Sequence, residues 1–431
     1  MNTPKHPSDV RVSRPERFQV AMHFHALDEM LPRDHQARLV WAYVESLDLS
    51  PIYQKIQVSK YAPGRSAIAP EILVALWLLA TLESISSARE LDRRCERDIP
   101  YMWICGGVSV NYHTLSDFRS QHAEFLERVL VDSVASLMHQ GLVPLETVAQ
   151  DGMRVRANAG SSSFRRKPSL LELQKQAADH VERLKQENEN EAARHETNAR
   201  RAAAQERAAR ERKQRIDEAI RECDELAKRR EKRKKGSGDE ARCSTTDPEA
   251  RRMKMANGGY DPAYNVQFAS DAEARFIVGV DVTNEGTDSN EMVPMMKRLE
   301  SSYRRRPAQI LVDSAFATQE AVTQVESKGT EVVAGIPRAG QIEKHGNDPH
   351  APRRGDSQAY QRFRARMKDP AYQELYKRRP SVAEFPNAAC RNHGLRQFRV
   401  RGLAKAKAVA LWHALAFNFQ RMMNLGILNQ V

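Results

Sequence analysis

Carboxylate side chains at three points of the chain carry the most specific chemistry in the sequence. Asp151 stands near the end of a predicted strand that begins at residue 147, and Gly152 beside it would let another backbone or a ligand come close. Asp313 ends a second, continuously apolar strand predicted at 309–315. Glu384 lies in a strongly basic neighbourhood. Each residue also has a plainer interpretation: a cap or turn residue for either aspartate, and an ion-pair partner for Glu384.

Three carboxylates brought to one point would support one defined kind of chemistry. Hard divalent cations such as Mg²⁺ bind oxygen ligands, which carboxylates supply. Two such ions activate a water or a 3′-hydroxyl and stabilise the leaving oxygen during phosphodiester transfer. Arginine side chains nearby would hold the phosphates through bidentate contacts. The sequence contains the carboxylates and arginines that this chemistry needs, but it does not show that they come together in the fold.

The elements that must position these side chains form an α/β pattern. From residue 145 to 337 the expected order is strand, helical insertion, two strands, helix, strand, helix and strand, which indicates a mixed sheet. The later strands are predicted at 263–269, 275–282, 309–315 and 330–336, and the helices at 289–303 and 319–328. If the strands of Asp151 and Asp313 are neighbours, both carboxylates lie at one edge of the sheet, where α/β folds bind ligands.

The first third of the chain is predicted to be helical. We expect helices at 25–49, capped by Asp34, at 71–82, where the helix is buried, and at 125–142. Between them, residues 84–122 predict two short helices, the first capped by Ser86 or Ser87. His113 and Arg119 would lie on the outer face of the second, which fits a helical DNA-binding module. Many helical hairpins are basic outside for solubility alone, so both interpretations stay open.

Residues 168–235 have a different composition, rich in Glu, Lys, Arg, Gln and Ala. A thin apolar seam at three- and four-residue spacing predicts one long helix or a helical hairpin of coiled-coil type. It would serve as a solvated spacer, or as an arm for dimerisation or for the DNA backbone; we favour an insertion with no chemistry of its own. The chain after residue 345 is polar and basic until a final amphipathic helix at 404–423.

The overall charge favours an acidic partner. The 431 residues carry a net charge of +12, which makes nucleic acid the first candidate, although part of the excess lies in the long helical segment and could merely solvate it. Five cysteines without a CxxC pair suggest reduced thiols in a cytosolic protein. No signal peptide is recognised, and the most apolar run, 68–82, is too short to cross a bilayer, so no membrane partner is expected.

An ordered set of motifs resembles the DDE transposases of bacterial insertion sequences, in the group that carries a Tyr-Arg-Glu-Lys signature. The match covers most of the chain, and each piece is weak alone while the ordered set is specific. The segments are TLSDFR at 114–119, QDGMRVRANA at 150–159, GGYDPAYNVQ at 258–267, VTNEGTDSNEMVPM at 282–295, LVDSAF at 311–316, YKRRPSVAE at 376–384 and GLRQFRVRGLAKAKA at 394–408.

The resemblance implies a fold and a set of roles. It implies an RNase H-like catalytic domain, with Asp151, Asp313 and Glu384 as the catalytic ligands of two Mg²⁺ (or Mn²⁺) ions. The substrate would be double-stranded DNA, both element ends and target, bound by a homodimer in the cytoplasm and at the nucleoid. Contacts to DNA would come from Tyr376, Arg379, Arg391, Arg396, Arg119 and His113.

The implied domains are a flexible N-terminus at 1–24, a helical DNA-binding domain at 25–143, a catalytic domain at 144–167 and 245–423, and a helical insertion at 168–244. Three features depart from the family pattern. Arg391 replaces the signature lysine, Pro386 falls inside a helical turn that it should disrupt, and Ser314-Ala315-Phe316 replaces a more usual Ala-Gly-Tyr. The alternatives to an active transposase are therefore a catalytically decayed DNA-binding relic, or a structure-specific nuclease on the same fold.

Overall fold

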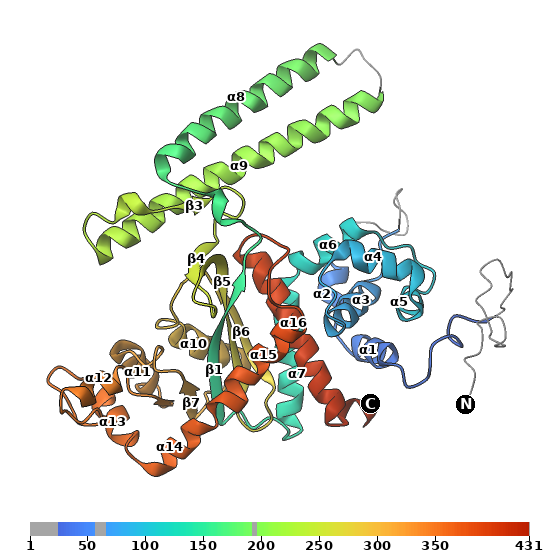
Figure 1. Ribbon diagram of the computed structural model, residues 1–431. Helices are drawn as coiled ribbons and strands as arrows, with labels where there is room; N and C mark the ends of the chain where they lie inside the picture. Colours follow the sequence, from blue (N-terminus) through green and yellow to red (C-terminus); the bar gives the residue numbers. More distant parts are fainter. Residues whose placement is uncertain (1–24, 57–65, 192–195, 431) are drawn as a thin grey trace, which may run out of the picture.

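The computed structural model describes residues 25–56, 66–191 and 196–430 (Figure 1). The segment predicted to be flexible, 1–24, lies outside the described residues. Within them the chain forms a helical N-terminal region, a mixed sheet covered by helices, and a long helical hairpin that projects from one end of the sheet (Figure 1). None of the helices described combines the length and the apolar character that a membrane span requires.

The N-terminal region is organised around one buried helix. Helix α3 (Pro70–Leu82) starts with a proline at its first position, where the missing N–H costs nothing, and all but one of its residues are buried. The indole of Trp77 donates to the carbonyl of Leu115, which ties α3 to α6. The predicted buried helix at 71–82 is confirmed. The other helices of this region are α1 (Gln36–Glu45), α2 (Ser50–Tyr53), α4 (Ala88–Arg97), α5 (Ile99–Cys105), α6 (Tyr112–Gln121) and α7 (Ala123–His139).

Caps explain where these helices begin. Ser87 accepts from the N–H of Glu90 and starts α4, as predicted, and Asn111 accepts from the N–H of Thr114 and starts α6. The predicted helix at 25–49 is shorter than expected, because turns occupy its first part and α1 begins only after His35. The ring of His35, not Asp34, accepts the N–H of Ala37 at 3.1 Å.

The sheet is mixed, as predicted. Its strand order is β4-β5-β1-β7-β8, and β6 also pairs with β5. Strand β5 is antiparallel to both of its neighbours β6 and β1, whereas β1, β7 and β8 are parallel. The bounds are β1 (Thr147–Arg156), β4 (Arg251–Lys254), β5 (Tyr260–Asp271), β6 (Ile277–Thr283), β7 (Gln309–Val312) and β8 (Glu331–Ala334).

Helices cover both faces of this sheet. Helix α10 (Met292–Tyr303) packs on β6, where Met295 lies so close to Gly279 that an added Cβ would approach its sulfur to 2.7 Å. Its residues Met292, Met295, Met296 and Leu299 are buried. Helices α15 (Phe385–Asn392) and α16 (Leu403–Asn424) pack against β1, β5 and β6. Because the side chain of Gln150 reaches Glu291 just before α10, and that of Asp151 reaches Asn387 in α15, these helices lie on opposite faces.

The segment 168–235 forms a hairpin rather than one straight helix. Helices α8 (Lys167–Glu191) and α9 (Glu196–Arg233) run antiparallel, because Gln174 bonds to Asp217 near one end and Asn188 to Glu206 near the other. At its root, β2 (Phe164–Arg165) pairs with β3 (Cys243–Ser244). The hairpin is inserted in the connection between the paired strands β1 and β5 (Figure 1).

The polar segment before the last helices contains more regular structure than its composition indicated. After β8 the chain forms α12 (Ala339–Lys344), α13 (Gln358–Arg366) and α14 (Pro370–Lys377), which cluster beside α11 (Gln319–Glu326) at the edge of the sheet (Figure 1). Ser357 and Asp369 cap α13 and α14 through their side chains. This cluster leads directly to Glu384.

Candidate active site

Strand register brings Asp151 and Asp313 to the same level of the sheet. The parallel pairs of β1 and β7 run from Thr147 with Gln309 to Ala149 with Leu311. Two residues further along each chain lie Asp151 and Asp313. The strands of Asp151 and Asp313 are therefore neighbours, which is the arrangement that the expected carboxylate site requires. Asp313 directly follows β7, as expected.

Asp151 itself is not at a strand end, which corrects the sequence-based expectation. Strand β1 continues for five more residues to Arg156 and stays paired with β5 throughout. The side chains of Met153 and Val155 lie on the same face of β1 and are buried, which holds this extension in place. Only the pairing with β7 stops at Ala149, so Asp151 lies where the parallel neighbour ends.

Glu384 ends a π-helical turn (η4, Pro380–Glu384) that leads without a break into α15. Such turns are rare and are frequent at functional sites. The expectation that Pro386 disrupts the helix is wrong. Pro386 lies in the first turn of α15, directly after the π-helical turn, and the helix continues through it to Asn392.

The guanidinium of Arg379 joins two of the three carboxylates. Its Nη1 lies 3.8 Å from Oδ1 of Asp151, and its Nη2 lies 2.9 Å from Oε1 of Glu384. The Arg379 side chain is only 14% exposed, whereas that of Glu384 is 53% exposed. Asn387 of α15 adds a hydrogen bond of 3.0 Å to Oδ2 of Asp151. The buried cation thus stands between carboxylates that come from β1 and from η4.

Burial raises the pKa of Asp151, while the positive charge of Arg379 lowers it and nearby Asp288 raises it again. A buried carboxylate in this setting is stabilised in its charged form by any cation that approaches it. Oxygen ligands from Asp151, Asp313 and Glu384 thus fit a hard divalent ion in chemical type. Across the described ranges, however, no three His, Cys, Asp or Glu side chains come close enough to form a metal site. The expected three-carboxylate cluster is therefore not assembled here.

Asp288 was missed from the sequence. Its Oδ1 accepts from Asn265 at 2.7 Å and from Gln267 at 2.8 Å, and its Oδ2 pairs with Arg154 at 2.8 Å. It lies directly over Gly152, where an added Cβ would be 2.2 Å from Oδ1. The close approach expected at Gly152 is thus made by a neighbouring carboxylate. The glycine beside Asp151 was the one signal in the sequence that pointed to it.

The residues expected to contact DNA fall into different settings. Arg391 and Arg396 are exposed and line a cleft of about 740 Å³ that begins at Gly152 and also contains Arg154, Arg156 and Lys254. Tyr376 lies between β8 and the loop after β7, because a Cβ built on Gly335 would be 3.5 Å from its hydroxyl and 3.7 Å from Cβ of Ser314.

In the helical region the two expected contacts differ. His113 is exposed and its ring lies 4.0 Å from that of Tyr112. Arg119 does not lie on the outer face, which corrects the prediction. It is 7% exposed, its guanidinium lies 4.8 Å from the ring of Trp77 and it donates to the carbonyl of Ser86. Burial lowers the pKa of Arg119 to about 10. The long aliphatic stem lets this charged residue pack inward.

Comparison with known families gives two matches. Residues 25–121 match the model of a transposase domain (DUF772), and residues 230–419 match the model of a transposase DDE domain. The second match contains Asp313 and Glu384, whereas Asp151 lies outside both ranges. No curated protein and no solved structure matches the chain.

Proposed function

We propose that the chain binds the terminal inverted repeats of its element, cuts the DNA there and transfers the freed strand to a target. The basis is that the chain belongs to the DDE transposases of insertion sequences. Its substrate is DNA and its family implies a divalent metal. The observation that supports the proposal is the register of β1 and β7, in which Asp151 and Asp313 each follow the last paired residue by two positions, together with Arg379, which contacts both Asp151 and Glu384.

The sheet supports an RNase H-like catalytic domain. Three antiparallel strands, β1, β5 and β6, are followed by two strands parallel to β1, in the spatial order β6-β5-β1-β7-β8. This domain would comprise residues 144–167 and 245–423, with the hairpin at 168–244 as an insertion. Residues 25–143 would form a helical DNA-binding domain, and a homodimer would pair the two element ends.

We assign Asp151, Asp313 and Glu384 as the ligands of Mg²⁺. When bound, two such ions activate the attacking water or 3′-hydroxyl and stabilise the leaving oxygen. Asn387 holds the Asp151 carboxylate in one orientation by donating to Oδ2. Arg391 and Arg396 in the adjoining cleft would hold backbone phosphates and so place the scissile bond against Asp151. Arg379 and Tyr376 would contact the transposon end.

One reason to consider a catalytically decayed protein was that Pro386 would disrupt the helix after Glu384. The helix continues from η4 into α15, so this reason is weaker. Arg391 instead of lysine keeps the charge at the cleft but offers a planar fork in place of a compact ammonium. A structure-specific nuclease would use the same carboxylates on junction DNA without needing inverted repeats.

A strand-cleavage assay tests the proposal directly. The purified chain is incubated with Mg²⁺ and duplex DNA spanning the boundary of its own element. We expect cleavage at the boundary that is lost in Asp313→Asn but kept in Asp179→Asn, a matched change on the exposed surface of α8. Salt-sensitive binding to the element ends without cleavage would refute the proposed transposase activity and favour a catalytically decayed DNA-binding protein. Cleavage of branched DNA in preference to the ends would favour the nuclease.

A further inference from the structure

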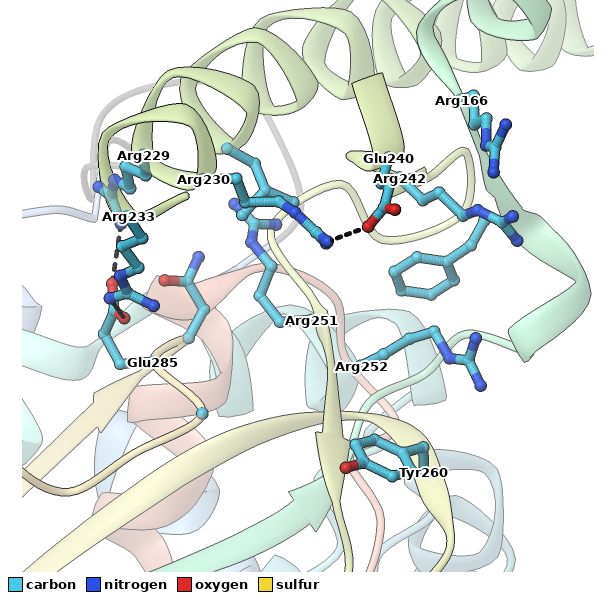
Figure 2. Close-up of a pocket in the computed structure, with 14 residues that line it drawn as sticks. Arg166, Arg229, Arg230, Arg233, Glu240, Arg242, Arg251, Arg252, Tyr260 and Glu285 are labelled. Atoms are coloured by element: carbon cyan, nitrogen blue, oxygen red, sulfur yellow. Dashed lines mark hydrogen bonds and ion pairs between the residues drawn. The ribbon is translucent and has the colours of Figure 1, made fainter. Parts of the chain in front are cut away.

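A second basic cavity lies at the root of the helical hairpin, away from the carboxylates. It has a volume of about 580 Å³ and is lined by α9, β4, β5 and the segments around β2 and β3 (Figure 2). Seven arginines and two glutamates line it. A concave site with this excess of positive charge concentrates anions from solution.

Part of this charge is already neutralised and holds the hairpin to the sheet. Glu285 pairs with Arg229 at 2.8 Å and with Arg233 at 3.8 Å, and Glu240 pairs with Arg230 at 2.8 Å. In Figure 2 these contacts occupy one side and the centre of the cavity. Arg251 at the back is paired with Glu222 of α9. These four arginines therefore fix the position of the hairpin root.

The other side of the cavity is different. Arg166, Arg242 and Arg252 are exposed, and none of them has an ion-pair partner among the residues that the structure describes. Figure 2 shows their side chains around one opening, with Tyr260 below. Tyr260 is 58% exposed, which is unusual for so large a ring. Unpaired guanidinium groups together with a tyrosine hydroxyl are the side chains that proteins use to contact the phosphates of a DNA backbone.

The cavity adjoins the cleft that begins at Gly152, next to the candidate active site. Gly286 lines both this cavity and the cleft that begins at Gly152. Arg156 of that cleft pairs with Asp261, the residue after Tyr260, at 3.1 Å. From Asp151 along β1 to Arg156, and from its partner Ala263 back along β5 to Tyr260, the path is about 26 Å at roughly 3.3 Å per residue. That length corresponds to about eight base pairs of B-DNA.

We propose that Arg166, Arg242, Arg252 and Tyr260 form a second site for backbone phosphates, which holds the same DNA duplex about eight base pairs from the bond that is cut. The root of the insertion is then a DNA clamp and not only a spacer. The proposal rests on the proposed function for the identity of the duplex, but the clamp can be measured by binding alone.

The test compares two triple variants of the full chain. Arg166→Gln/Arg242→Gln/Arg252→Gln removes the proposed contacts. Arg183→Gln/Arg207→Gln/Arg221→Gln makes the same change in net charge at exposed positions of α8 and α9 that do not line the cavity and have no ion-pair partner in the described structure. Binding to a fluorescent 30-base-pair duplex spanning the element boundary is measured at several salt concentrations, without divalent metal.

Each lost phosphate contact lowers the slope of log affinity against log salt by about 0.9. For the first variant we therefore expect the magnitude of this slope to fall by about 2.7. A fourfold rise in salt then weakens wild-type binding about 40-fold more than it weakens binding of the variant. The control should stay within one unit of wild type. The single variant Arg252→Gln should lose about 0.9. Shortening the duplex to four base pairs on one side of the boundary should remove the difference between wild type and the first variant.

Equal slopes for the two triple variants would overturn the clamp, because they would show a general effect of charge. A slope difference that persists on duplexes shortened on either side would also overturn it. Failure of the proposed function is a separate result: it would appear as absent cleavage while the salt slopes still differ. Unchanged thermal unfolding of the first variant checks that the exposed substitutions leave the fold intact.

Discussion

Replacing Arg379 by glutamine should strengthen the binding of a divalent ion at the carboxylates. In the structure the guanidinium lies 3.8 Å from Asp151 and 2.9 Å from Glu384, so it occupies the position of a counter-cation. A divalent ion that binds Asp151 must compete with this charge. The glutamine side chain has similar length but no charge, so it removes the competitor without opening a large gap.

The size of the effect follows from burial. At an effective dielectric of about 20, two charges separated by 3.8 Å attract by roughly 4 kcal/mol. The Asp151 side chain is 22% exposed, so solvent screens part of this attraction and leaves a net interaction of about 2 kcal/mol between Arg379 and Asp151. The half-exposed pair with Glu384 adds little. The expected gain is therefore roughly 30-fold in affinity for Mn²⁺.

Calorimetric titration of Mn²⁺ into the DNA-free chain measures this gain. The matched control is Arg378→Gln, because Arg378 is the preceding residue, is exposed and donates to the carbonyl of Ala272 instead of to a carboxylate. Asp151→Asn should abolish the binding event in either background. An unchanged or weaker affinity in Arg379→Gln would refute the reasoning, since it would show that the arginine does not compete with the ion.

Three further outcomes are expected from the surroundings of the site. Gly152→Ala places a Cβ 2.2 Å from Oδ1 of Asp288 and 2.4 Å from Nε2 of Gln267, so chemical denaturation should show a loss of about 1–3 kcal/mol, whereas Gly340→Ala, where nothing lies within 4 Å, should be nearly neutral. Asn387→Leu removes a donor to Asp151, which should raise the pKa of that carboxyl further and move the acidic limb of the cleavage pH profile to higher pH; an unmoved limb would contradict this role. Burial raises the pKa of Glu291 to about 7, so its protonated form is favoured in the fold, and its contribution to stability is complete below pH 4.5 and is lost as the pH rises through 7. Glu291→Gln should therefore raise the free energy of unfolding at pH 8 relative to that at pH 5 by up to about 3 kcal/mol compared with wild type, measured by urea denaturation at both values.

The order of helices and strands was predictable from the sequence because it rests on local signals. Ser87 and Asn111 cap their helices by bonds that span three residues, and Pro70 marks the start of α3. The mixed character of the sheet followed from the alternation of strands and helices after residue 245. The neighbouring positions of Asp151 and Asp313 could be stated only as a condition, because pairing between strands more than 150 residues apart leaves no local pattern.

The side chains around Asp151 could not be predicted for the same reason. Arg379 reaches it from the position just before η4 and Asn387 from α15, more than 220 residues along the chain. Arg119 was placed outside because a charged residue in a basic helix is usually solvated, whereas here the ring of Trp77 and the carbonyl of Ser86 give it an interior site. The effect of Pro386 could not be predicted, because no pattern in the sequence marks the π-helical turn that precedes it and continues into α15.

The extension of β1 beyond Asp151 connects the candidate active site to the hairpin. Had the strand ended at the carboxylate, the insertion would leave the sheet next to the candidate active site. Instead β1 and β5 stay paired to Arg156 and Ala263, and β4 then pairs with β5 from Ala263 to Tyr260. The hairpin root is therefore held at a fixed distance from Asp151 by continuous backbone pairing. Strands paired in this way resist bending, so the sheet sets the spacing between the two proposed phosphate-binding sites.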